Sequence, residues 1–99
     1  MYASVLIVDL RLPLTDSLKA KRAAITPVLE GARRRHKVAV SEVGRQDDRR
    51  RSELAFATVA SSEHQAREVL DAVERFVWSF PELEIVSSRR GWLEEEETS

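Results

Sequence analysis

The hydrophobic positions divide the chain into six segments, and their spacing distinguishes strands from helices. In the first segment, residues 2–12, one alternating set of positions is fully apolar: Leu6, Val8, Leu10 and Leu12. The opposite set begins with Val5 and Ile7 and turns polar at Asp9. This alternation predicts a strand with one buried face and a second face that is apolar only near its start.

Two segments have the spacing of amphipathic helices. Residues 17–35 are predicted to be a helix with Thr15, Asp16 or Ser17 as its N-cap. Its apolar stripe is Leu18, Ile25, Val28, Leu29 and Ala32. Pro27 removes one main-chain hydrogen bond, so this helix is expected to be kinked. The second helix is predicted to begin at a capping box, Ser62 to Gln65, and to end before Pro81. Its stripe is Ala66, Val69, Leu70, Val73, Phe76, Val77 and Phe80.

The remaining segments are predicted to be strands. A segment without periodicity separates residues 37–44 from residues 51–60, and these two strands are predicted to form a hairpin. The last strand is predicted over residues 82–90. The order strand, helix, strand, strand, helix, strand predicts an α+β, ferredoxin-like βαββαβ fold. Its four-stranded antiparallel sheet should have the order 4-1-3-2, with both helices on one face. We expect one domain over residues 1–93 and an acidic, disordered tail over residues 94–99.

The amino-acid composition excludes several kinds of site. The 99 residues include no cysteine, which excludes disulfides, thiolate metal sites and cysteine nucleophiles. No apolar run approaches the ~20 residues of a membrane span, and the first residues lack the basic region of a signal peptide. A cytoplasmic protein without membrane contact is therefore expected.

The charges are unevenly distributed, with a run of glutamates over residues 94–97 and an excess of cations elsewhere. The predicted topology gathers these cations at two basic poles. One pole comprises Lys19, Lys21, Arg22, Arg45, Arg49, Arg50 and Arg51. The other comprises Arg33, Arg34, Arg35, His36, Lys37, Arg89 and Arg90. Such poles fit contact with RNA phosphates, and they fit a solvated surface equally well.

The chain lacks the residues that form the known sites of other proteins with this fold. Acylphosphatases use a glycine-rich loop and an asparagine, but residues 13–16 contain no glycine and the chain has no asparagine. RNA-recognition motifs stack bases on strand aromatics, and the equivalent strands offer only Phe56, which is expected in the core. His36 and His64 lie near helix ends, and Asp9 and Glu42 belong to strands that a third strand separates. No catalytic, metal or cofactor site is predicted.

Both helices are predicted on one face of the sheet, so the apolar positions of the other face stay open to solvent. Val5 and Ile7 would be exposed on it, so a homodimer through this face is expected as one solution. Trp78 lies off the stripe of the second helix, and Trp92 follows the last strand. Either one fits a partner's surface or simple packing over an element's edge.

Two motifs resemble those of the YlxP-like family of small bacterial proteins, a domain of unknown function. Ser-Leu-Lys-Ala-Lys-Arg at residues 17–22 is similar to the family's Ser-Leu-Lys-x-Lys-Arg signature. Glu-Val-Gly-Arg-Gln-Asp at residues 42–47 resembles the family's Glu-Val-Gly/Asp-x-Gln-Asp turn. The family-motif turn comprises Glu42, Gln46, Asp47 and Arg51. The family often continues with Leu-Trp, whereas Asp-Arg-Arg follows here, so charge replaces a stacking aromatic.

The resemblance covers residues 2–90 and implies a ferredoxin-like fold. Genes of this family commonly lie beside those for translation initiation and ribosome maturation, which implies a role near the ribosome, with no established activity or cofactor. Our first hypothesis is a non-enzymatic accessory protein that contacts ribosomal RNA or a ribosomal particle. Its phosphate contacts would be Lys19, Lys21, Arg22, Arg49, Arg50 and Arg51.

Two alternatives stay open. One is a dimeric protein-interaction or regulatory module whose interface includes Val5, Ile7 and Trp78. The other is an enzyme acting on a phosphorylated small molecule bound near the family-motif turn.

Overall fold

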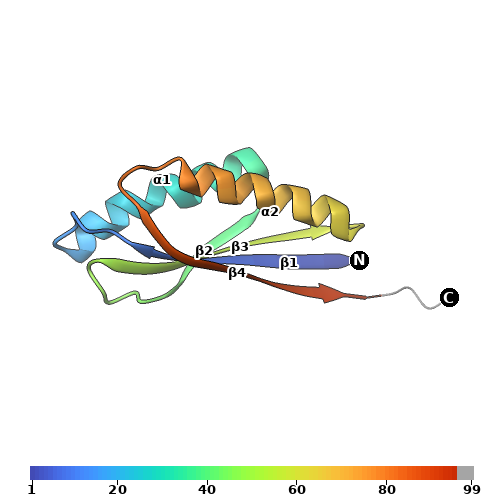
Figure 1. Cartoon of the computed structure of the whole chain (residues 1–99), viewed down its shortest axis with the longest axis horizontal. Helices are drawn as coiled ribbons and strands as arrows, with labels where there is room; N and C mark the ends of the chain where they lie inside the picture. The colour runs from blue at the N-terminus through green and yellow to red at the C-terminus, as the bar shows by residue number, and fades with distance from the viewer. Residues whose placement is uncertain (96–99) are drawn as a thin grey trace.

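The computed structural model describes residues 1–95 and has the predicted order of elements. These are β1 (Tyr2–Arg11), α1 (Leu18–His36), β2 (Ala39–Gly44), β3 (Arg51–Ala60), α2 (Glu63–Trp78) and β4 (Glu84–Glu94). All neighbouring strands are antiparallel, in the order β2-β3-β1-β4, and both helices cover the same face of the sheet (Figure 1). The ferredoxin-like prediction is therefore confirmed, since this is the predicted strand order read from the other edge.

The core lies between the helices and the sheet. Alternate residues of β1 and β3 point into it, and Leu6, Leu54 and Phe56 are completely buried there. The helices contribute the buried side chains Ile25, Val28, Ala32, Ala66, Leu70, Val73 and Val77. The alternation and the helical stripes of the sequence thus meet in a single core, as binary patterning requires.

Serine residues cap both helices. The side chain of Ser17 accepts from the Ala20 N–H at 3.0 Å, which selects it from the three possible caps. The side chain of Ser62 accepts from the Gln65 N–H at 3.2 Å, but the Gln65 side chain accepts from the Ser61 hydroxyl instead of completing the box.

Two predicted strands begin too early and one ends too early. Residue Lys37 is the αL cap of α1, and its N–H donates to the Arg33 carbonyl, so β2 starts only at Ala39. Strand β4 starts at Glu84 and continues to Glu94. The Glu95 N–H donates to the Met1 carbonyl at 3.0 Å, so sheet pairing passes the domain boundary predicted at residue 93. The rest of the predicted tail, residues 96–99, lies outside the described residues.

The molecule is elongated, 55 Å long and about 22 × 20 Å in cross-section. Figure 1 shows α1 over one half of the sheet, near the β2–β3 turn, whereas α2 reaches toward the end where the N-terminus lies. No helix of residues 1–95 lies on the opposite face of the sheet. Within residues 1–95, no helix is both long and apolar enough to cross a membrane.

Candidate functional site

Lys21 lies buried at the centre of the hairpin end, where the start of α1 meets the β2–β3 turn. Its side chain is 1% exposed, and its Nζ lies 3.0 Å from Oε2 of Glu42. The same Nζ donates to three main-chain carbonyls, at 2.8 to 3.2 Å, those of Arg45, Gln46 and Arg51. The ammonium thus satisfies carbonyls that the turn leaves without strand partners.

The family-motif turn surrounds Lys21 and is itself held by hydrogen bonds. Ser52 donates to Glu42 Oε2 at 2.6 Å, and the Gln46 side chain donates to the Glu42 carbonyl at 3.0 Å. The pairing of β2 with β3 shifts between Glu42 and Gly44, where a Cβ would come within 2.5 Å of Glu53 Oε2. A side chain at residue 44 would therefore require the Glu53 side chain to move. Both family motifs therefore build a turn around a buried lysine.

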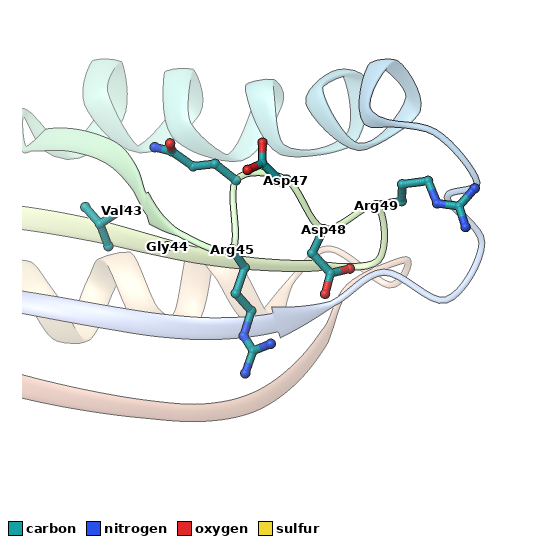
Figure 2. A pocket seen from close by; sticks show the side chains of 7 residues that line it. Val43, Gly44, Arg45, Asp47, Asp48 and Arg49 are labelled. Carbon is teal, nitrogen blue, oxygen red and sulfur yellow. The ribbon is translucent and has the colours of Figure 1, made fainter.

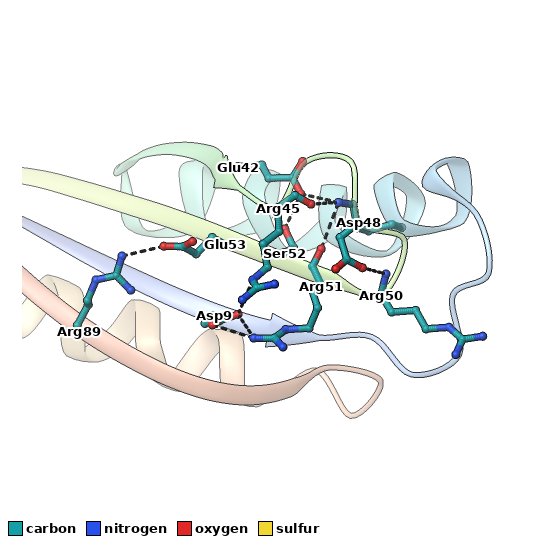
Figure 3. Close-up of polar contacts among 10 residues, drawn as sticks. Asp9, Glu42, Arg45, Asp48, Arg50, Arg51, Ser52, Glu53 and Arg89 are labelled. Carbon is teal, nitrogen blue, oxygen red and sulfur yellow. Dashed lines mark hydrogen bonds and ion pairs between the residues drawn. The ribbon is translucent and has the colours of Figure 1, made fainter.

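Arg51 belongs to the uncovered sheet face. Its Nη2 lies 3.0 Å from each carboxylate oxygen of Asp9, and Arg45 approaches the same carboxylate at 4.0 Å (Figure 3). The Arg51 Nε is buried without a hydrogen-bond partner in the described chain. Arg51 is thus held by an ion pair between β3 and β1.

These contacts correct the predicted RNA-binding set at Lys21, whose buried ammonium is not free to bind a ligand, whereas Arg51 is 26% exposed and pairs with Asp9. Charge alone placed both cations in that set. Lys21 in fact shares the buried stripe of α1 with Ile25, Val28 and Ala32, a spacing visible in the sequence.

Four predicted cations remain exposed at this end, and we call them the hairpin cation patch: Lys19, Arg22, Arg49 and Arg50. Arg49 Nη1 donates to the Asp16 carbonyl at 3.3 Å, and Arg50 Nε donates to the Thr15 carbonyl at 3.2 Å. Among residues 1–95, no carboxylate oxygen lies within 4.0 Å of a charged nitrogen of the four. The two arginines are positioned by main-chain carbonyls, which leave their charges uncompensated.

The turn between the patch residues is itself ordered by hydrogen bonds. Thr15 donates its hydroxyl to the Arg49 carbonyl at 2.6 Å, which links the turn to the β1–α1 loop. The Arg50 N–H donates to Asp48 Oδ1 at 2.8 Å and holds the pKa of Asp48 below its usual value. Figure 2 shows the Arg49 side chain extending from the end of the turn toward that loop.

The surface of the turn is an open depression lined by residues 43–49, without enclosing walls. Asp47 lines it, but Glu42 faces Lys21 and Arg51 faces Asp9. The four residues predicted for a phosphorylated small molecule therefore do not converge on one pocket. In the part of the chain that the structure describes, no cluster of acidic or histidine side chains could hold a metal ion.

The predicted interface residues also fall on separate surfaces. Val5 and Ile7 lie on the uncovered sheet face, opposite Ala57 and Ala55 of β3. Trp78 is the last residue of α2, on the other side of the sheet, and is 62% exposed. An interface through the open face would therefore not include Trp78.

Several cations of the second basic pole form ion pairs with carboxylates. Arg89 pairs with Glu53 at 2.7 Å, and Arg90 pairs with Asp71 and Glu74. Burial lowers the pKa of Arg90, but the hydrogen bonds to these two carboxylates outweigh it and raise the pKa. Arg33 pairs with Glu30, and within the described residues the members of the pole without a carboxylate within 4.0 Å are Arg34, Arg35, His36 and Lys37.

Comparison with known proteins identifies relatives without a known role. Residues 3–90 match the model of a family described as "Protein of unknown function (DUF503)". The chain is 38% identical over 77 residues to "Uncharacterized protein YlxP" of Bacillus subtilis (strain 168), covering 78% of this chain and 84% of the relative. A solution NMR structure of a de novo designed protein with a ferredoxin fold aligns over the whole chain and 90% of its own length, with 16% identity and a TM-score of 0.49.

Proposed function

The chain belongs to the DUF503 family of proteins of unknown function, and we propose that it is a non-enzymatic accessory protein that binds the phosphate backbone of ribosomal RNA. The hairpin cation patch is the contact surface. The observation that carries the proposal is the state of Arg49 and Arg50, which are held by main-chain carbonyls and have no carboxylate partner in residues 1–95.

Such anchoring suits phosphate binding for a physical reason. A guanidinium has five N–H donors, and each of these arginines uses one of them on a carbonyl. The remaining donors and the full positive charge stay available, while the tether reduces the side-chain entropy lost on binding. A phosphate would therefore meet two preorganised arginines.

The start of α1 adds to the positive electrostatic potential around Arg49 and Arg50. Its first turn contains no acidic residue, and Lys19 and Arg22 extend from this turn and the next. The positive end of the helix dipole also favours an anion here. Asp16, Asp47 and Asp48 lie nearby and reduce the net charge, so we expect moderate affinity with a strong dependence on salt.

The test is a salt titration of binding to ribosomal RNA fragments. Changing Arg49→Ser and Arg50→Ser together should flatten the plot of log affinity against log salt by about 1.4 units, because each phosphate contact to a single strand contributes ~0.7. Affinity should fall alike for fragments of different sequence, since phosphates carry no base identity.

The matched control changes Arg34→Ser and Arg75→Ser, two exposed arginines remote from the turn that also lack a carboxylate within 4.0 Å in residues 1–95. This variant removes the same charge, so its salt slope should stay near that of the wild type. Equal slopes for all three proteins would refute the proposal.

A second candidate is a dimeric protein-interaction module, which the open sheet face favours. Val5, Ile7, Ala55 and Ala57 form a strip of apolar positions that no element of residues 1–95 covers. If two copies join through this strip, Ile7→Glu should dissociate them while leaving circular dichroism unchanged. Their association should also depend only weakly on salt, in contrast to RNA binding.

A further inference from the structure

Strand β4 is a long edge strand whose outer side has no partner in the sheet. It spans 11 residues and, in the described part of the chain, pairs only with β1. The other edge, β2, has six residues and a register shift near its end. From Ser87 to Glu94, β4 keeps a regular register with β1 and contains neither proline nor lysine. Proline, lysine and a register shift, which protect many sheet edges, are therefore missing from this stretch, and its charged residues are Arg89, Arg90 and Glu94.

The contacts at the chain ends define which main-chain groups face outward. Met1 and Glu95 exchange two main-chain hydrogen bonds, at 3.0 and 3.2 Å, so the N–H and C=O of Glu95 point toward β1. These directions alternate along an antiparallel strand. The main-chain groups of Arg90, Trp92 and Glu94 consequently point away from β1, toward the free edge.

We propose that β4 pairs antiparallel with β4 of a second copy, about a two-fold axis at Trp92, to form a continuous eight-stranded sheet. In this register Arg90 faces Glu94 of the second copy, and Arg89 faces Glu95 of the second copy. Each outward-facing residue then pairs with an outward-facing residue. The contact is isologous, so every pair except the central one occurs twice.

The sequence of residues 89–95, Arg-Arg-Gly-Trp-Leu-Glu-Glu, is complementary to itself only in this register. An axis at residue 91 places Arg90 opposite Trp92, and an axis at residue 93 places Trp92 opposite Glu94. Among pairs formed within residues 89–95, only the axis at Trp92 sets both arginines opposite glutamates, and opposite charges across strands stabilise such pairs.

The side chains around the axis have the space and the free charges that this pairing needs. Trp92 is 69% exposed and Leu93 is 61% exposed. A Cβ at Gly91 would have no neighbour within 4 Å, which leaves room for Leu93 of the second copy. In residues 1–95 no cationic nitrogen lies within 4.0 Å of the Glu94 or Glu95 carboxylate. Arg89 and Arg90 use Nη2 for their intrachain partners and keep other donors free.

Cross-linking tests the register directly, on a background without cysteine. At a hydrogen-bonded cross-strand pair the Cα atoms lie ~5.5 Å apart, within the range of a disulfide. Mild oxidation of Trp92→Cys should therefore yield a covalent dimer. Leu93→Cys is the control: it is adjacent and similarly exposed, but it faces Gly91 of the second copy, so it should cross-link at least tenfold more slowly. Equal rates for the two variants would overturn the proposal.

Sedimentation tests the association without a covalent bond. Wild type should be dimeric at about 100 µM, and Glu94→Arg with Glu95→Arg should raise the dissociation constant at least tenfold. Mixing that variant with one carrying Arg89→Glu and Arg90→Glu should restore dimers, because the reversed charges match again. A monomeric wild type, or dimers that Ile7→Glu dissociates and the glutamate variant does not, would overturn the proposal.

Discussion

Replacing Lys21 by methionine tests whether the hairpin end depends on this single ammonium. Methionine keeps the length and packing of the side chain but removes its charge and its three donors. The Glu42 carboxylate, whose side chain is 17% exposed, would keep only the Ser52 hydroxyl as a side-chain donor among residues 1–95. The carbonyls of Arg45, Gln46 and Arg51 would lose their partner at the same time.

The expected loss of stability follows from those contacts. Breaking a buried ion pair by removing one partner costs about 3–5 kcal/mol, because the other charge stays desolvated. For a chain of this size each kcal/mol shifts Tm by about 4–8 °C, so Lys21→Met should lower Tm by about 12 °C or more. Adding Glu42→Gln removes the orphaned charge and should recover about 1–2 kcal/mol.

Urea denaturation followed by circular dichroism measures both changes. The control is Lys19→Met in the same turn of α1, where the exposed side chain has no ion-pair partner within residues 1–95 and the change should stay within about 0.5 kcal/mol. If Lys21→Met denatures at the same urea concentration as Lys19→Met, the ammonium does not hold the turn and our reasoning fails.

Two further predictions concern the core and the turn. Leu6→Ala and Val73→Ala each remove a completely buried side chain, so each should cost about 2–4 kcal/mol, and unchanged denaturation midpoints would contradict the assigned core. The lowered pKa of Asp48 means that its ionised form favours the folded state, a contribution that is complete above the ordinary value of 3.8 and lost as pH falls through the folded pKa. Proton titration by NMR should therefore place Asp48 below 3.8 in the folded chain, and a midpoint at or above that value would contradict the Asp48–Arg50 contact.

The sequence predicts the elements well where side-chain periodicity is strong. The alternation in β1 and the stripe of α2 each extend over many residues, so the element type and the buried face follow from spacing. Strand β4 lacks such a signal after Val86, because its residues there are mostly polar and exposed. Main-chain pairing with β1 carries it to Glu94, and that cause is not local to the segment.

The candidate site was only partly predictable for a related reason. Net charge assigned Lys21 and Arg51 to a ligand surface, although the position of Lys21 on an apolar stripe indicated burial. The pairing of Arg51 with Asp9 depends on the register between β3 and β1, which no local pattern specifies. The tethering of Arg49 and Arg50 likewise requires the β1–α1 loop, more than 30 residues away in sequence.

The two proposals make a joint prediction, because the patch and the edge contact lie toward opposite ends of the molecule. Figure 1 shows the β2–β3 turn at one end of the long axis, whereas the N-terminus and the last residues of β4 lie at the other. A two-fold axis at Trp92 would therefore direct the two hairpin cation patches outward, at the far ends of the dimer. Two such patches can bind one RNA together only if that RNA spans the distance between them.

In this dimer, a substitution can add positive charge and still lower the affinity for RNA. Glu94→Arg with Glu95→Arg adds positive charge, which by itself strengthens binding to RNA. In the dimer the same change breaks the edge contact, so a long ribosomal RNA fragment should bind at least tenfold more weakly despite the added cations. A fragment too short to reach both patches should bind the variant no more weakly than wild type. Stronger binding of the variant to both fragments would show that the dimer does not join two RNA sites.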